Sequence, residues 1–184
     1  TQELEEALKL SKEEIIRKVE LGIETFDMKK KTCLMTDWSK IGIGFRLIQK
    51  NCGCDSESPN CCMDDWGLVF ASGRFLTPAE SRYSPVEGEC LAAAWAMVKA
   101  KYFLLGCESF VLATDHKPLL GILSDRSIED VENPRLQRLK EKTLRFNFSI
   151  CHVPGKHNNV ADTASRYPTT QPEEGDTLGQ LDFL

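Results

Sequence analysis

Residues 31–47 (KTCLMTDWSKIGIGFRL) constrain the fold more than any other part of the chain. The apolar run at 33–35 predicts a buried strand, and an apolar pattern resumes at 41–45, where glycines permit close backbone approach. Asp37 and Ser39 lie between the two runs, and both are typical turn residues. We therefore predict two consecutive strands with an acidic side chain in the turn that joins them. Taken alone, Asp37 is better explained as a turn former than as a ligand.

The periodicity of the apolar residues predicts the rest of the architecture. Further strands are expected at 66–76, 110–113 and 146–153, and helices at 84–106, 117–123, 134–145 and 159–166. The order strand, strand, strand, helix, strand, helix, strand, helix predicts an α/β domain in which a five-stranded mixed sheet is flanked by helices.

Composition divides the chain into three parts. The 184 residues, 41% hydrophobic and 28% charged, suit one domain with a core of its own, which we place at 31–167. Residues 1–30 are predicted to be a helical lead-in, and 168–184 an acidic flexible tail or linker. The net charge of −5 argues against a free-standing nucleic-acid binder, but four acids in 167–184, a stretch without Lys or Arg, account for most of it.

The chain carries no sign of secretion or membrane insertion. No apolar run approaches the ~20 residues of a membrane span, and the first residues lack the basic and apolar regions of a signal peptide. We therefore expect an intracellular protein that is not secreted and has no membrane partner. The chain begins without Met, which we interpret as a piece of a longer protein.

Without a secretory signal, the eight cysteines are expected to be reduced thiols. Four of them, which we call the cysteine cluster, follow the pattern C-x-C-x6-C-C: Cys52, Cys54, Cys61 and Cys62. Four thiolates can close a tetrahedral Zn²⁺ site, but the spacing is not that of a standard zinc finger and the adjacent pair is awkward as joint ligands. Free thiols in an exposed loop are the alternative.

Four acids stand at comparable places, at strand ends or in helices: Asp37, Glu89, Asp115 and Asp162. Each has an ordinary explanation as a turn residue, a helix N-terminal charge or a surface residue. In a mixed sheet, however, the ends of the first and fourth strands can be neighbours. Two carboxylates placed there repel each other and lose hydration unless cations lie between them.

Four ordered motifs carry a family resemblance: TDWS at 36–39, YSPVEGECLAAAWAM at 83–97, ATDHKPLL at 113–120 and HVPGKHNNVADTASR at 152–166. Together they resemble the ribonuclease H domain of gypsy-type LTR retrotransposon Pol polyproteins. The resemblance covers about residues 31–168, and the lead-in is similar to the connection that joins the reverse transcriptase to this domain.

The resemblance implies the ribonuclease H-like fold and an endonuclease that hydrolyses the RNA strand of RNA·DNA hybrids with two Mg²⁺ (or Mn²⁺) ions. It implies that Asp37 bridges both ions, that Glu89 and Asp115 hold one, and that Asp162 holds the other. Carboxylates are the hard oxygen ligands that these ions prefer. Glu87 is set aside, because the apolar stripe that follows it lines up with Glu89.

Some residues depart from the family pattern without removing a carboxylate. Trp38 replaces the small residue usual after the first Asp, and Thr163-Ala164 stand where a small residue and leucine are common. His157 lies near the place of a loop histidine of cellular ribonucleases H, so it is either a proton shuttle or a surface imidazole. His116 is expected to orient the turn after Asp115.

Substrate recognition is expected to use 2′-hydroxyl and phosphate contacts. Candidates near the acids are Ser39, Arg74 and Ser84. A basic stripe on one helix supplies the others: Arg135, Arg138, Lys142 and Arg145. A solvated helix face is the alternative for the stripe. The implied partners are the hybrid and the adjacent polymerase domain of the same polyprotein, in the cytoplasm within a retrotransposon particle.

Two other functions are consistent with parts of the sequence. One is an integrase- or transposase-like DNA nuclease, a class with the same sheet and two-metal chemistry. The Glu in the helix after the third strand and the VPGKHNN turn argue against this class. A catalytically inactive connection-type scaffold is the other, and the complete set of acids argues against it.

Overall fold

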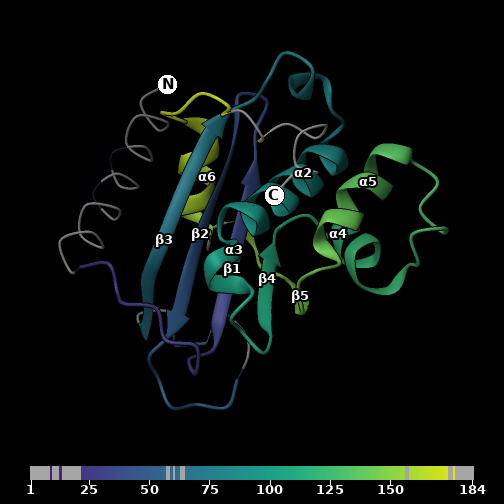
Figure 1. Cartoon of the computed structure of the whole chain (residues 1–184). Coiled ribbons are helices and arrows are strands. Elements are labelled where there is room, and N and C mark those ends of the chain that lie inside the picture. The colour runs from purple at the N-terminus through teal and green to yellow at the C-terminus, as the bar shows by residue number, and fades with distance from the viewer. Residues whose placement is uncertain are drawn as a thin grey trace.

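The computed structural model describes residues 22–56, 59, 61–62, 65–155, 158–173 and 176, together with Lys9 and Glu13. Its strands are β1 (Thr32–Trp38), β2 (Gly42–Lys50), β3 (Trp66–Phe75), β4 (Phe110–Thr114) and β5 (Phe148–His152). They form a sheet in the order β3-β2-β1-β4-β5, shown in Figure 1. The first three are antiparallel neighbours, whereas β1, β4 and β5 run parallel. The predicted five-stranded mixed sheet is confirmed.

Helices connect the strands much as the sequence predicts. They are η2 (Glu80–Arg82), α2 (Pro85–Lys99), α3 (Lys101–Leu104), α4 (Pro118–Leu120), the π-helical turn η3 (Gly121–Asp125), α5 (Pro134–Thr143) and α6 (Asn159–Arg166). The long helix α2 begins with a capping box, in which the Ser84 backbone N–H donates to Glu87 Oε2 at 2.8 Å. Pro85 occupies the first position of the helix, where its missing N–H costs nothing.

Helices cover both faces of the sheet. In the view of Figure 1, α2 and α3 lie in front of the sheet and α6 lies behind it. Leu34, Phe45 and Leu112 project from the strands into the core beneath α2. On the other face α6 packs on the hairpin very closely, because a Cβ added at Gly44 would lie 2.6 Å from the Ala164 side chain. The sequence expectation that glycines allow close approach here is confirmed.

The described part of the C-terminal segment packs on the domain, although we expected a flexible tail. Thr170 forms a parallel bridge with Arg74, and its backbone oxygen accepts from Phe75 N at 2.9 Å. Asp176 is 7% exposed, and its Oδ1 accepts from Trp95 Nε1 at 3.0 Å. Residues 168–173 and 176 therefore belong to the packed domain. The other residues of this segment lie outside the described ones.

Most of the predicted helical lead-in also lies outside the described residues. Lys9 and Glu13 form an exposed ion pair four residues apart, at 4.0 Å. Residues 22–30 run beside the sheet, where Glu24 N donates to Leu68 O at 2.8 Å. Crossing a bilayer would need a helix longer and more apolar than any that the described residues form.

Candidate metal and active site

Three of the four predicted carboxylates meet at one end of the sheet. Asp37 lies near the end of β1, Asp115 directly follows β4, and Glu89 lies in the second turn of α2. Because β1 and β4 are parallel neighbours, the C-terminal ends of both strands lie at the same edge of the sheet. One carboxylate oxygen of each of these residues lies within 4.8 Å of the other two. We call the three residues the carboxylate cluster.

Burial makes charge in the carboxylate cluster costly. Asp37 is 5% exposed and Glu89 is 6% exposed. Burial raises the pKa of Asp37 to about 7, and the nearby charges of Asp162 and Asp115 add to the shift. A hydrogen bond from Ser165 Oγ to Asp37 Oδ2, at 2.5 Å, opposes it. Burial, followed by the charges of Asp37 and Asp115, raises the pKa of Glu89 to about 9.

The donor atoms of the carboxylate cluster fit a divalent cation. Glu89 Oε2 is buried and has no hydrogen-bond partner among the described residues, while the backbone N–H of Trp38 donates to the Glu89 carboxylate. A buried carboxylate oxygen without a donor is uncommon and needs an explanation. A cation would satisfy this oxygen and relieve the repulsion between the acids. The donors are all hard oxygens, which suit Mg²⁺ or Mn²⁺.

The fourth predicted acid, Asp162, borders the carboxylate cluster without joining it. Its Oδ1 accepts from Arg166 Nε at 2.7 Å, one turn further along α6. Its charge is still close enough to raise the pKa of Asp37. The start of α6 is fastened to β1, because Asn158 Nδ2 donates to Thr36 O at 2.9 Å. The Arg166 guanidinium therefore partly neutralises the charge of Asp162 in this structure.

Three small residues that the sequence analysis did not single out shape this site. Ser165 donates to Asp37, as described above. A Cβ at Gly88 would lie 2.3 Å from the Trp38 ring, and a Cβ at Gly155 would lie 2.9 Å from Asp115 Oδ2. A side chain at Gly88 would clash with the Trp38 ring, and one at Gly155 would displace the Asp115 carboxylate. These residues lie inside the motifs at 83–97 and 152–166 that carry the family resemblance, and this position was the sequence signal that could have identified them.

Comparison with known proteins agrees with this geometry. The family described as "RNase H-like domain found in reverse transcriptase" matches residues 27–146. The chain belongs to this family. This match and the Pol polyprotein relatives described next together confirm the predicted resemblance to the ribonuclease H domain of gypsy-type Pol polyproteins.

Curated relatives of this RNase H-like domain are far longer than the chain. The Pol polyprotein from transposon 297 of Drosophila melanogaster is 34% identical over 170 residues, which are 90% of this chain and 14% of the relative. The Pol polyprotein from transposon gypsy of the same organism is 33% identical over 140 residues, 76% of this chain and 12% of the relative. The chain thus spans about an eighth of the length of these relatives.

A solved structure supports the fold. RNase H1 from the halophilic archaeon Halobacterium salinarum NRC-1 superposes with a TM-score of 0.50 and 20% identity. The superposition covers 73% of this chain and 92% of that one. The ribonuclease H-like architecture expected from the resemblance is confirmed.

The structure gives the two serines predicted as substrate contacts a role inside the RNase H-like domain. Ser39 Oγ accepts from Gly42 N at 3.0 Å and donates to Ser165 O at 2.7 Å, so it closes the β1–β2 turn and holds α6. Ser84 Oγ donates to Glu87 Oε2 at 2.9 Å within the capping box. Both hydroxyls therefore already have partners within the protein.

Arg74 is not placed at a substrate surface. It is 1% exposed, and its two terminal nitrogens donate to the Glu80 carboxylate at 2.9 Å each. It also donates to Asp176 O at 3.1 Å and lies over the Trp95 ring. We expected this arginine to contact substrate, whereas the structure uses it to join β3, η2 and the C-terminal segment.

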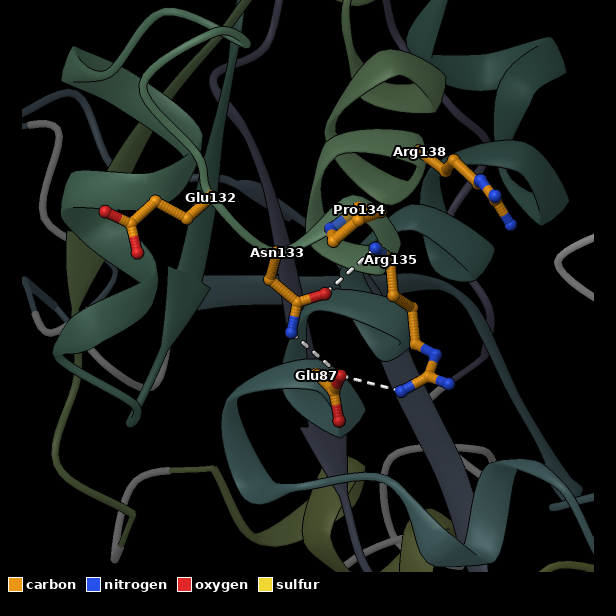
Figure 2. Close-up of a pocket in the computed structure, with 6 residues that line it drawn as sticks. All are labelled: Glu87, Glu132, Asn133, Pro134, Arg135 and Arg138. Atoms are coloured by element: carbon orange, nitrogen blue, oxygen red, sulfur yellow. Dashed lines mark hydrogen bonds and ion pairs between the residues drawn. The ribbon is translucent and has the colours of Figure 1, made fainter.

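The predicted basic stripe on α5 divides into exposed and buried members. Lys142 is 9% exposed, and burial lowers its pKa. Arg135 is exposed, but its NH1 donates to Glu87 Oε1 at 2.7 Å and its guanidinium lies over the Tyr83 ring. Arg138 is exposed and lines the same open pocket of about 570 Å³ as Glu87 and Arg135, shown in Figure 2. This pocket lies at the first turn of α2, the helix that carries Glu89 into the carboxylate cluster.

Glu87, two residues before Glu89, binds protein groups instead of joining the carboxylate cluster. Burial opposes ionisation, but hydrogen bonds from Ser84, Asn133 and Arg135 outweigh it and lower the pKa of Glu87 to about 2. In Figure 2 the Asn133 amide and the Arg135 guanidinium both reach its carboxylate. The choice of Glu89 over Glu87 as the candidate ligand agrees with this geometry.

The remaining candidates lie in turns and loops. His116 N donates to Thr114 Oγ1 at 3.1 Å, which places the histidine in the turn after β4. His157 lies outside the described residues. The cysteine cluster lies in the loop that joins β2 and β3, at the bottom of Figure 1. This loop follows the end of β2, whereas Asp37 pairs with Gly44 near the start of β2.

Proposed function

We propose that this domain is an endonuclease that hydrolyses the RNA strand of RNA·DNA hybrids, as part of a retrotransposon reverse transcriptase. The observation that carries the proposal is the convergence of two buried carboxylates, Asp37 and Glu89, with the half-buried Asp115, around a Glu89 oxygen that has no hydrogen-bond partner among the described residues. Such a group is costly in a folded protein unless it binds cations. Membership of the RNase H-like family supplies the reaction class.

The carboxylates have distinct roles in this proposal. Asp37, on which the charges of both Asp162 and Asp115 act, would be a ligand of both divalent cations, with Glu89 and Asp115 holding one and Asp162 the other. Mg²⁺ or Mn²⁺ held by these residues would supply Lewis-acid activation of a water and charge stabilisation at the leaving 3′ oxygen. Ser165 fixes the orientation of the Asp37 carboxylate through its hydrogen bond. Arg166 holds Asp162 at the border of the site.

Recognition of the hybrid would use the surface beside the carboxylate cluster. Arg138 and Arg145 on or just after α5 are exposed, and a phosphate backbone is bound mainly by such side chains. Arg135 is held by Glu87 and so presents a fixed donor group at the pocket edge. Because the whole chain has a net charge of −5, its own affinity for the hybrid is expected to be weak. We propose that an attached polymerase domain supplies the missing affinity.

The test is cleavage of end-labelled RNA in an RNA·DNA hybrid, beside single-stranded RNA and duplex DNA, with and without Mg²⁺ or Mn²⁺. Only the hybrid should be cut, giving 5′-phosphate and 3′-hydroxyl ends. Asp115→Asn should reduce the rate strongly, since losing a group that merely orients a ligand already costs about 10- to 100-fold. Asp130→Asn is the matched control, because Asp130 is exposed and, among the described residues, its side chain bonds only to Ser127 in its own turn.

The alternatives predict other outcomes. Cleavage of duplex DNA alone would favour an integrase-like nuclease. No cleavage with either metal, even when the domain is fused to its polymerase, would favour an inactive scaffold. Equal activity of Asp115→Asn and the wild type would exclude the carboxylate cluster as the catalytic centre.

A further inference from the structure

The loop between β2 and β3 gathers four thiols into a space that suits one metal ion. All four Sγ atoms of the cysteine cluster lie within 4.8 Å of one another. Cys54 Sγ lies 3.5 Å from that of Cys52, 2.9 Å from that of Cys61 and 3.8 Å from that of Cys62. In a tetrahedral site with metal–sulfur bonds of about 2.3 Å, neighbouring sulfurs are about 3.8 Å apart. The four thiols therefore need only small shifts to surround a cation.

The backbone conformation at Cys61 and Cys62 allows both of these adjacent thiols to point into the same space. Cys62 has a φ of 48°, in the left-handed region that non-glycine residues rarely adopt, and its Sγ lies 3.5 Å from that of Cys61. The surrounding contacts hold this turn: Asp65 N donates to Cys62 O at 2.8 Å, and Trp66 Nε1 donates to Cys61 O at 2.9 Å. Backbone conformations of this kind are strained and are concentrated at functional sites.

Two lysines bond to the loop and can offset the negative charge of bound thiolates. Lys50 is only 4% exposed, and its Nζ donates to the backbone oxygens of Cys54, at 2.7 Å, and of Ser56. Lys31 Nζ donates to Asp55 O at 2.8 Å. Four thiolates around one divalent cation leave a net charge of about −2, which two ammonium groups offset. The same bonds fix the first half of the loop in place.

We propose that the cysteine cluster binds one Zn²⁺ ion as a structural site that fastens the end of β2 to the start of β3. Soft thiolate ligands favour Zn²⁺ over Mg²⁺ or Mn²⁺, and four protein ligands leave no open position for a substrate. The thiols lose their protons to solvent as the thiolates coordinate the ion, with no change of oxidation state. The site shares no residue with the carboxylate cluster and does not depend on the proposed nuclease activity.

The first experiment measures metal content in the full chain purified with a non-thiol reductant. Elemental analysis should find one zinc per chain, and replacement by Co²⁺ should give thiolate-to-cobalt charge transfer and the visible bands of tetrahedral Co²⁺. Cys54→Ser should lose most of the zinc. Cys107→Ser is the matched control, since Cys107 is half-buried outside the loop and its thiol contacts Thr32 and Phe103. This variant should keep the full zinc content.

A second measurement needs no variant, so it stands even if Cys54→Ser misfolds. In the zinc-loaded wild type, alkylation of the cysteine cluster should be slow, and a strong chelator should make these four thiols reactive and lower the unfolding midpoint. Any of three results would overturn the proposal: no bound zinc with all four thiols freely reactive, iron in place of zinc, or a disulfide between Cys54 and Cys61 under the purification conditions.

Discussion

Replacing Glu89 by glutamine tests the metal site through stability as well as activity. Glu89 has a raised pKa of about 9, chiefly because it is buried, against an ordinary value of 4.5. As the pH rises above 4.5 the unfolded chain releases a proton that the folded chain retains, so the folded state loses stability. The loss is about 1.4 kcal/mol per pH unit, or about 4 kcal/mol near pH 7.5 without metal.

Glu89→Gln removes this penalty because glutamine cannot ionise. It also places an amide N–H₂ group where Glu89 Oε2 has no partner among the described residues, which costs about 1–3 kcal/mol. The net expectation without metal is a gain of about 1–3 kcal/mol, or roughly 2–12 °C in unfolding midpoint for a chain of this size. Excess Mg²⁺ should raise the wild-type midpoint clearly. It should raise that of Glu89→Gln by less than half as much, because one ligand is missing.

Glu87→Gln is the matched control, two residues away on the same helix. It weakens the charge-assisted hydrogen bonds from Ser84 and Arg135, and should cost about 1.5–3 kcal/mol with or without Mg²⁺. Its response to Mg²⁺ should equal that of the wild type. Thermal melts in EDTA and in excess MgCl₂, at two pH values between 5 and 8, measure all of these changes. The reasoning is refuted if Glu89→Gln is destabilised in EDTA and keeps the full Mg²⁺ response while Glu87→Gln loses it.

Three further predictions address neighbouring features. Ser165→Ala removes a hydrogen bond that lowers the pKa of Asp37, so the pH at which cleavage reaches half its maximum should rise, and an unchanged pH profile would contradict this. Glu80→Gln leaves Arg74 buried without its full partner and should cost about 3–5 kcal/mol in denaturant unfolding, with little change in KM for the hybrid in folded protein. Arg138→Ala should raise KM and leave kcat unchanged, with an effect that fades at high salt; a fall in kcat alone would assign this arginine another role.

The sheet and the positions of Asp37 and Asp115 could be predicted from local sequence, whereas the family resemblance was needed to choose Glu89 over Glu87. The apolar runs at 33–35 and 110–113 predict buried strands, and an acid follows each run. Once these strands are parallel neighbours, their ends meet, and Asp37 and Asp115 come together without further information. The start of α2 was equally clear, since Ser84 and Pro85 are strong signals for a helix N-terminus.

Residues whose partners lie far along the chain were placed less well. Arg74 follows a glycine near a strand end, where an arginine is usually exposed, yet Glu80 and Asp176 together bury it. The partner at 176 lies in a stretch whose composition is typical of disorder, so no local pattern could have indicated this contact. Lys142 has the spacing of an exposed stripe, but it is covered in the fold. Its burial depends on tertiary packing that helical periodicity does not contain.

The two candidate metal sites lie at opposite ends of strand β2, which pairs with β1 on one side and with β3 on the other, so the register of β2 matters to both. Asp37 pairs with Gly44, and a shift of β2 by one residue would turn its side chains to the opposite face and remove the glycine from beneath α6. The pairing of β2 with β3 already contains an irregularity between Leu47 and Ile48, so this ladder is the weaker constraint on register. A Zn²⁺ ion bound between the end of β2 and the start of β3 would fix the pairing of Lys50 with Trp66. By holding β2 in place, a structural ion at one end of this strand would keep Gly44 under α6 and Asp37 in the carboxylate cluster at the other.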